Sequence, residues 1–199
     1  MENEIIAGNV YDKYGSRNPV VRLLMKSFYS SLNELLIPLE LNNLLEVGCG
    51  EGHLASYMKK LKSTIKTEGI DISSDIIKLA SETYPDIKFS VQSLYGLSYP
   101  DNSFDMVVAS EVLEHLEYPE KAMTELKRVT KKHCLLSVPR EPLWRILNIL
   151  RLKYLNRLGN TPGHMQHWNK KKFLDLIGNQ FEIEKICFPT PWIMALCKK

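Results

Sequence analysis

Three glycines at alternate positions, Gly48, Gly50 and Gly52, are the first residues whose spacing suggests chemistry. They lie in LLEVGCGEGHLA (44–55), after an apolar run and before a helical pattern. Glycine adopts positive φ at little cost and lets the backbone pass close to a ligand bound at a helix N-terminus. The spacing therefore predicts a ligand-binding turn. A dinucleotide fingerprint requires a further glycine where His53 stands, which disfavours an NAD-dependent oxidoreductase.

A carboxylate follows this turn at a distance that suggests a nucleoside ligand. Asp71 ends the next apolar run, roughly 20 residues after the glycines, where an acid can accept hydrogen bonds from both hydroxyls of a ribose. The alternative role is a cap for the helix that follows.

A second reactive group lies in SEVLEHL (110–116), which contains Glu111, Glu114 and His115. On a helix, Glu111 and His115 would share one face, with Glu114 beside them. His115 could act as a general base oriented by a carboxylate. The same residues, with His164 or His167, could instead hold a divalent ion, or they could brace a cleft. We predict catalytic roles for Glu111, Glu114 and His115 and assign no metal ligand.

The elements that must position these residues alternate along the chain between short apolar strands and helical patterns. Strands are expected over 44–48, 64–71, 87–92, 103–110, 133–139, 181–189 and 191–199, and helices over 19–37, 51–62, 73–84, 118–130 and 169–180.

This alternation requires a parallel sheet with helices on both faces. The last two strands are separated by Thr190 and its flanking prolines, which leaves no room for a crossover helix, so they must form an antiparallel hairpin. The predicted fold is a seven-stranded, mostly parallel α/β sheet with a C-terminal antiparallel hairpin, in one domain over 1–199. Ligands bind such sheets outside the carboxyl ends of the strands.

Four segments between residues 40 and 140, LLEVGCGEG, GIDIS, YPDNSFDMVVASEVLEHL and LLSVP, occur in the order of a known family. They resemble successive motifs of class I S-adenosylmethionine-dependent methyltransferases, in particular the methyltransferase type 11 group that contains ubiquinone-biosynthesis O-methyltransferases. The resemblance implies a Rossmann-like fold, S-adenosyl-L-methionine as cofactor and S-adenosyl-L-homocysteine as product.

The family pattern also assigns roles by position. Glu46 matches the acid that organises the glycine loop and the amino-acid end of the cofactor, Asp71 matches the ribose acid, and Ile72 would pack on adenine. The family's adenine-contacting aspartate is replaced here by Ser93, so either Ser93 or the backbone of Leu94 would take over the adenine contact. The predicted cofactor-binding set is Glu46, Gly48, Gly50, Gly52, Asp71, Ile72, Ser93, Leu94, Ser110 and Tyr14.

Two further segments should cover the site: an N-terminal lid and helix (1–40) and a substrate cap (140–168). Within the cap, Leu143, Leu147, Leu150, Tyr154 and Leu158 recur at helical spacing. From residue 142 to residue 174 there are seven Lys or Arg, two His and no acid. A basic amphipathic helix of this kind favours an anionic or lipid-like small acceptor and contact with a membrane surface. The alternative is a solvated basic face on a helix packed against the core.

The net charge and composition limit which classes of partner, location and cysteine chemistry we expect. A formal charge of +3 is too small to imply a polyanion by itself, so no stable nucleic-acid partner is expected. No apolar run approaches the roughly 20 residues of a membrane span, and the acidic start lacks a signal-peptide pattern, so we expect a cytoplasmic protein. The four cysteines show no C-x-x-C pairing and are expected as buried thiols.

The predicted function is methyl transfer from S-adenosylmethionine to a small molecule, at a hydroxyl oxygen. Such a displacement depends mainly on positioning, and a general base is needed only for a weakly acidic acceptor such as a hydroxyl. Three alternatives remain: an RNA 2′-O-type methyltransferase, an NAD-dependent oxidoreductase and a non-catalytic cofactor-binding protein.

Overall fold

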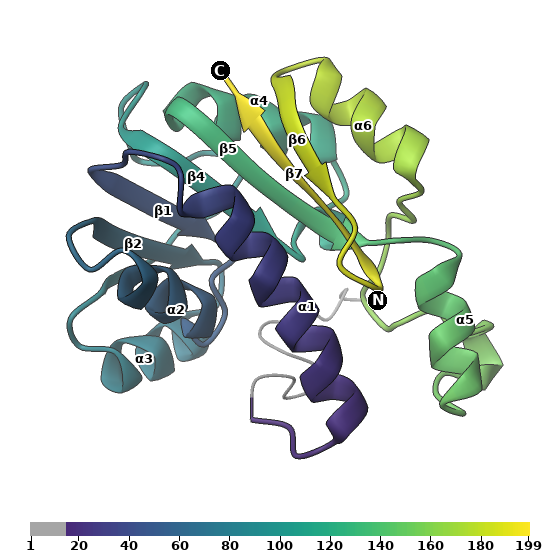
Figure 1. Cartoon of the computed structure of the whole chain (residues 1–199). Coiled ribbons are helices and arrows are strands. Elements are labelled where there is room, and N and C mark those ends of the chain that lie inside the picture. Colours follow the sequence, from purple (N-terminus) through teal and green to yellow (C-terminus); the bar gives the residue numbers. More distant parts are fainter. Residues whose placement is uncertain (1–14) are drawn as a thin grey trace.

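The computed structural model describes residues 15–199 and contains one seven-stranded sheet flanked by helices (Figure 1). Tyr14 and the first part of the predicted lid lie outside the described residues. The elements are α1 (Pro19–Leu36), β1 (Asn43–Val47), α2 (His53–Leu61), β2 (Lys66–Asp71), α3 (Ser74–Thr83), β3 (Lys88–Val91), β4 (Phe104–Ser110), η1 (Leu113–His115), α4 (Pro119–Val129), β5 (Thr130–Pro139), α5 (Leu143–Leu150), η2 (Leu155–Arg157), α6 (Lys170–Gly178), β6 (Glu182–Cys187) and β7 (Trp192–Lys198).

The strand order is β3-β2-β1-β4-β5-β7-β6. Strands β1 to β5 pair in parallel, whereas β7 is antiparallel to both of its neighbours, β5 and β6. The predicted fold class and the C-terminal hairpin are therefore confirmed. Strand order reverses between β1 and β4, which places the ligand crevice at their carboxyl ends. The antiparallel β7 between β5 and β6 differs from the 3-2-1-4-5-6 order of dinucleotide-binding sheets and argues against the NAD alternative.

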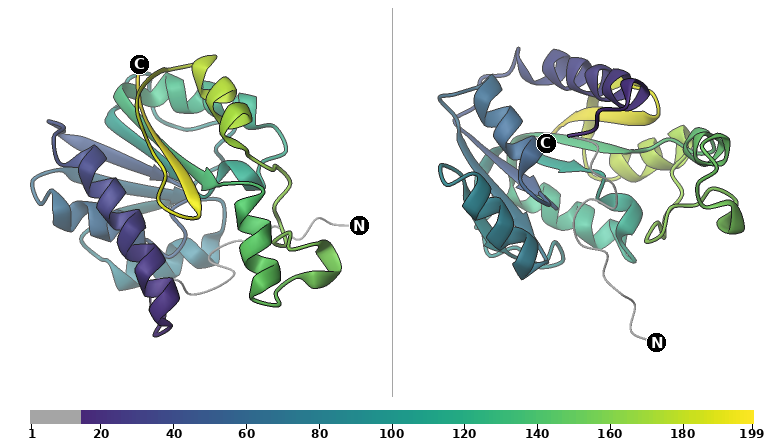
Figure 2. Two further views of the ribbon diagram at one scale, coloured as in Figure 1. Left: turned by 45° about the vertical axis from the view of Figure 1, so that its right-hand side comes forward. Right: turned by 90° about the horizontal axis from the view of Figure 1, so that it is seen from below.

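The core lies on both faces of the sheet because successive side chains of a strand point to opposite sides. On β4, Met106 and Val108 pack in the cluster that contains residues of α1 and α2. Their neighbours Val107 and Ala109 pack in the other cluster, with residues of α4 and α6. The views in Figure 2 show these helices above and below the sheet. The central residues of β4, from Met106 to Ala109, are thus apolar on both faces of the sheet.

The predicted cap helix was too long. The helix α5 ends at Leu150, and the periodic Tyr154 and Leu158 lie beyond it, on either side of η2. Both of them, and Leu152, have positive φ. Those three residues cannot continue a right-handed helix, so hydrophobic spacing alone overestimated its length. Within residues 15–199, no helix combines the length and the apolar character needed to cross a membrane.

Candidate functional site

The glycine loop joins β1 to α2 and depends on backbone geometry that only glycine adopts easily. Gly48, Gly50 and Gly52 have φ of 66°, 52° and 79°. A Cβ on Gly48 would lie 2.5 Å from Val112 Cγ2, and one on Gly52 would lie 2.7 Å from Phe89 Cζ. A Cβ on Gly50 would meet nothing within 4 Å. Two glycines are therefore needed for packing, and the third borders open space where a ligand can approach the backbone.

Asp71 connects this loop to the end of β2. Its Oδ2 accepts a hydrogen bond from Gly50 N at 3.0 Å, and its Oδ1 accepts one from Ser73 N at 3.1 Å. The N-cap of α3 is Ser73, whose Oγ accepts from Ile76 N, so the alternative role of Asp71 as the helix cap is not what the structure shows. The carboxylate instead fixes the glycine loop beside the next strand end.

The other predicted cofactor residues lie around this loop with different degrees of access. Glu46 is buried on β1, and the Ile72 side chain beside Asp71 is 51% exposed. Ser93 Oγ accepts from Tyr95 N at 3.3 Å. The Leu94 side chain is buried, so only its backbone is suited to contact a ligand. The Ser110 hydroxyl lies 2.8 Å from the hydroxyl of Ser137 on β5 and contributes to the sheet.

The acidic segment after β4 does not form the expected helix. It forms the single turn η1, and Glu111 precedes that turn with a φ of 61°, a strained conformation for a residue other than glycine. Glu111 Oε2 accepts a hydrogen bond from Trp192 Nε1 at 2.6 Å. The expectation that Glu111 and His115 share one helical face is therefore wrong, because no helical turn connects them.

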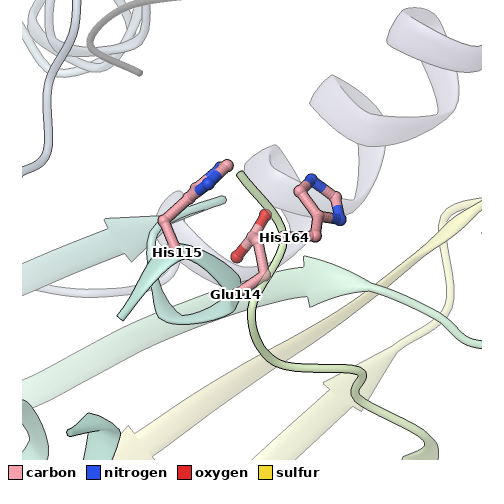
Figure 3. Close-up of side chains that lie close together, drawn as sticks. All are labelled: Glu114, His115 and His164. Atoms are coloured by element: carbon pink, nitrogen blue, oxygen red, sulfur yellow. The ribbon is translucent and has the colours of Figure 1, made fainter. Parts of the chain in front are cut away.

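Glu114, His115 and His164 do come together, although His164 lies 49 positions after His115 in the sequence. One ligand atom from each lies within 4.8 Å of the others. Figure 3 shows the three side chains on two separate segments, η1 and the stretch that precedes α6. The half-buried His167 is not part of this group, and its buried Nδ1 atom has no hydrogen-bond partner among the described residues.

A seam of hydrogen bonds holds these two segments together. The carbonyl oxygen of Glu114 accepts from Met165 N at 2.8 Å and from Gln166 N at 3.0 Å. His115 Nδ1 lies 3.0 Å from the carbonyl oxygen of Gly163. A carbonyl only accepts, so Nδ1 carries the proton of a neutral imidazole and Nε2 carries the lone pair. This geometry gives His115 the tautomer of a base or of a metal ligand.

His164 is kept neutral by its surroundings. Burial, with His115 and His167 nearby, lowers its pKa to about 3. Its ring stacks on Trp144 with centroids 6.0 Å apart and meets His115 edge to face at 5.0 Å. Trp144 was not among the predicted site residues, because an apolar face of a cap helix gives no sign of which side chain turns inward. The indole Nε1 of Trp144 is held by Thr161 Oγ1 at 2.9 Å.

The Glu114, His115 and His164 group fits a divalent transition-metal ion. One carboxylate and two imidazoles form a common ligand set for Fe(II), Zn²⁺ and related ions. Both required protonation states are favoured, since His164 is neutral and Nε2 of His115 carries a lone pair. Glu111, the other acid of the segment, contacts Trp192 and lies outside the group.

Comparison with known proteins shows what the chain is similar to. Residues 45–138 match the family model described as a methyltransferase domain. An uncharacterized methyltransferase of Schizosaccharomyces pombe is 34% identical over 101 residues, covering 45% of this chain and 36% of that protein. The mitochondrial ubiquinone biosynthesis O-methyltransferase of Candida albicans is 34% identical over 94 residues, covering 43% of this chain and 28% of that protein.

A solved structure covers far more of the chain. Magnesium protoporphyrin IX methyltransferase from Synechocystis PCC 6803, with bound SAH, aligns with a TM-score of 0.68 at 17% identity, over 93% of this chain and 89% of that one. The chain itself spans about a third of the length of the curated relatives it matches. Residues 45–138, which contain the glycine loop and Asp71, thus match a methyltransferase domain, and the chain has the fold of the solved methyltransferase with bound SAH.

Proposed function

We propose that the chain transfers a methyl group from S-adenosylmethionine to a hydroxyl oxygen of a small molecule. The observation that carries the proposal is the convergence of two sites at the carboxyl ends of the parallel strands. The glycine loop and Asp71 follow β1 and β2, and the Glu114, His115 and His164 group lies between the end of β4 and the cap.

Two observations support cofactor binding: the space beside Gly50 is open, and the Asp71 carboxylate accepts a hydrogen bond from Gly50 N. Backbone close to a ligand suits the amino-acid end of the cofactor, and Asp71 at a strand end suits the ribose. The exposed side chain of Ile72 offers an apolar surface for adenine. Glu46, Ser93, the backbone of Leu94, Ser110 and Tyr14 complete the proposed cofactor set.

The acceptor half rests on His115. A hydroxyl is a weak acid, so its oxygen becomes an effective nucleophile when a base removes the proton as the new bond forms. In the proposed step the oxygen attacks the methyl carbon, the carbon–sulfur bond breaks and its electron pair stays on sulfur. The hydroxyl proton passes to Nε2 of His115, which the Gly163 carbonyl orients through Nδ1. Glu114 stabilises the imidazolium that results.

Glu111 is proposed to act indirectly. Its carboxylate holds Trp192, whose ring lies 6.1 Å from that of Trp144, which in turn stacks on His164. Glu111 is therefore a positioning residue for the acceptor side.

A divalent metal is the alternative to a base acting alone. A bound ion would lower the pKa of the acceptor hydroxyl, and Glu114, His115 and His164 are the residues that would hold it. Under this alternative the methyl group still goes to the hydroxyl oxygen, but activity requires an added cation.

A small acceptor is favoured over RNA. The relative from Candida albicans is named for ubiquinone biosynthesis and O-methylation, which supports a small, apolar hydroxyl compound as the acceptor class. No appended RNA-binding motif is recognisable in the sequence.

The test is transfer of a labelled methyl group from S-adenosylmethionine to a panel of small phenols, each paired with the matching amine. We expect labelled ether from the phenols, and a loss of about 10²–10⁴-fold in kcat in His115→Gln. The matched control is His133→Gln, since His133 pairs with Glu184 outside the site. Labelling of the amines alone would overturn the oxygen assignment, and labelling of no compound in any panel would favour a non-catalytic cofactor-binding protein.

The metal alternative has its own readout. Dialysis against a chelator, followed by assay with and without added Mn²⁺ or Zn²⁺, separates a metal site from a base. Full activity after chelation would exclude the metal. Activity restored by the ion in the wild type but not in His164→Ala would assign it to this group.

A further inference from the structure

The cap that follows β5 turns its apolar side chains outward. Of the eight residues of α5, the buried one is a polar residue, Asn148. Leu150, Leu152 and Leu158 are 73%, 78% and 69% exposed. A helix of a globular protein normally buries its apolar face, whereas this segment leaves much of its apolar surface exposed. An exposed apolar patch of this kind marks an interaction surface.

Polar contacts inside the cap hold this arrangement in place. Asn148 Nδ2 donates to the carbonyl oxygen of Gly159 at 2.9 Å and to Thr161 Oγ1 at 3.2 Å. Arg145 Nε donates to the carbonyl oxygen of Leu158 at 2.9 Å. Gly159 has a φ of 77°, and a Cβ there would clash with the Arg145 carbonyl group. The loop is therefore fastened to α5 through its polar interior, which leaves the leucines on the outside.

The shape of the molecule makes this patch accessible. In Figures 1 and 2, α5 and the loop after it stand out from the end of the sheet, away from the helices that cover its two faces. The apolar side chains of this projection are the exposed ones in residues 143–158, namely Ile146, Ile149, Leu150, Leu152, Leu155 and Leu158. We call residues 143–158 the cap patch.

The charged residues of the cap patch indicate the kind of surface that it binds. Arg151, Lys153 and Arg157 are exposed among the leucines of the cap patch. The sequence from residue 142 to residue 174 contains no acid, although the whole chain carries 23 acids against 26 bases. A surface that interleaves leucine with cations and lacks acids is complementary to the interface of an anionic bilayer, where acyl chains lie beneath phosphates.

A groove at the base of α5 also combines apolar side chains with cations. It has a volume of about 530 Å³ and is lined by Ile146 of the cap patch, by the cations Arg140, Lys170 and Lys171, and by one acid, Glu141. Arg140 and Lys170 also lie over the ring of Phe188, at 6.0 and 5.4 Å from its centroid. Cations therefore border the apolar side chains of the cap patch at its base as well as along its length.

We propose that the cap patch docks on an anionic phospholipid bilayer, with its leucines in the interface and its cations at the lipid phosphates. The proposal does not depend on methyl transfer, because the docking residues are separate from the glycine loop and from Glu114, His115 and His164.

The test is co-sedimentation of the cofactor-free protein with vesicles of phosphatidylcholine alone or of equal parts phosphatidylcholine and phosphatidylglycerol. We expect binding to the anionic vesicles that weakens as salt is added. The double variant Leu150→Ser/Leu152→Ser should lower the partition coefficient about tenfold or more. Arg151→Glu/Lys153→Glu should remove the preference for anionic vesicles.

The matched control is Leu23→Ser, because Leu23 on α1 is 67% exposed and lies outside the cap patch. Circular dichroism should show that all variants remain folded, since each altered side chain is exposed. Absence of binding to anionic vesicles, or equal losses in Leu23→Ser and in the cap variant, would overturn the proposal. A concentration-dependent dimer that the cap variant abolishes, without vesicle binding, would also overturn it and assign the cap patch to self-association.

Discussion

The cofactor side and the acceptor side of the crevice are built by different means. On the cofactor side, the loop after β1 and the end of β2 are 21 residues apart, and positive φ at three glycines and one carboxylate fix their geometry. On the acceptor side, η1 is bound to residues 163–166, about 50 positions later, through the carbonyl oxygen of Glu114 and the side chain of His115. The cofactor side is therefore formed by residues close together in the sequence. The acceptor side forms only when residues 163–166 of the cap pack against η1.

This difference predicts that the cofactor side tolerates substitution least. Gly48→Ala should impose a disfavoured positive φ and a clash with Val112, which together destabilise the fold by about 2–6 kcal/mol. Binding of S-adenosylhomocysteine should be lost. Thermal unfolding and calorimetry check both effects.

The control for that substitution is Gly96→Ala, because a Cβ there would meet nothing within 4 Å and its φ is not positive. Equal stability and equal ligand affinity in Gly48→Ala and Gly96→Ala would show that the loop does not need its geometry.

On the acceptor side, Glu111 is predicted to hold Trp192 in place. Glu111→Ala removes the acceptor of the Trp192 indole and should lower the free energy of unfolding by about 1.5–3 kcal/mol. Glu111→Gln keeps an acceptor oxygen and should lose less. Urea denaturation measures the difference, with the exposed Glu117→Ala as the reference. Identical losses in Glu111→Ala and Glu111→Gln would contradict a role for this hydrogen bond.

The acceptor side should also carry a pH signature. The pKa of His164 is about 3 in the fold, below the ordinary 6.5, so between these values the unfolded chain binds a proton that the folded chain does not. Stability from this group is present above pH 6.5 and is lost as the pH falls, by up to about 1.4 kcal/mol per pH unit.

The variant His164→Asn lacks this titration and should show a flatter stability profile between pH 7 and pH 5. Urea midpoints of both proteins at several pH values make the comparison. Parallel profiles would mean that His164 is not buried in its neutral form.

The glycine turn after β1 and the C-terminal hairpin could be predicted from the sequence because their signals are local. Glycine spacing, the acid at the end of β2 and the single residue between the last two prolines each act within a few positions of the feature they specify. The sheet class followed from the alternation of strands and helices, and the antiparallel hairpin followed from the short connection at Thr190; both are confirmed.

The acceptor side could not be read in the same way. A helical face for Glu111 and His115 assumed a helix that β4 does not lead into, since Glu111 turns back toward Trp192 on β7. The choice of His164 over His167 depends on where the cap loop returns, which is a long-range contact. The cap helix was predicted too long because outward leucines have the same spacing as buried ones.

Calorimetric titration with S-adenosylhomocysteine is the most direct test that the loop after β1 and Asp71 form a methyl-donor site. The wild type should bind, Asp71→Ala should bind at least tenfold more weakly because a ribose contact and the bond to Gly50 are both lost, and the nearby Asp75→Ala should match the wild type. Failure of the wild type to bind, or equal affinity in wild type and Asp71→Ala, would contradict the assignment of this site.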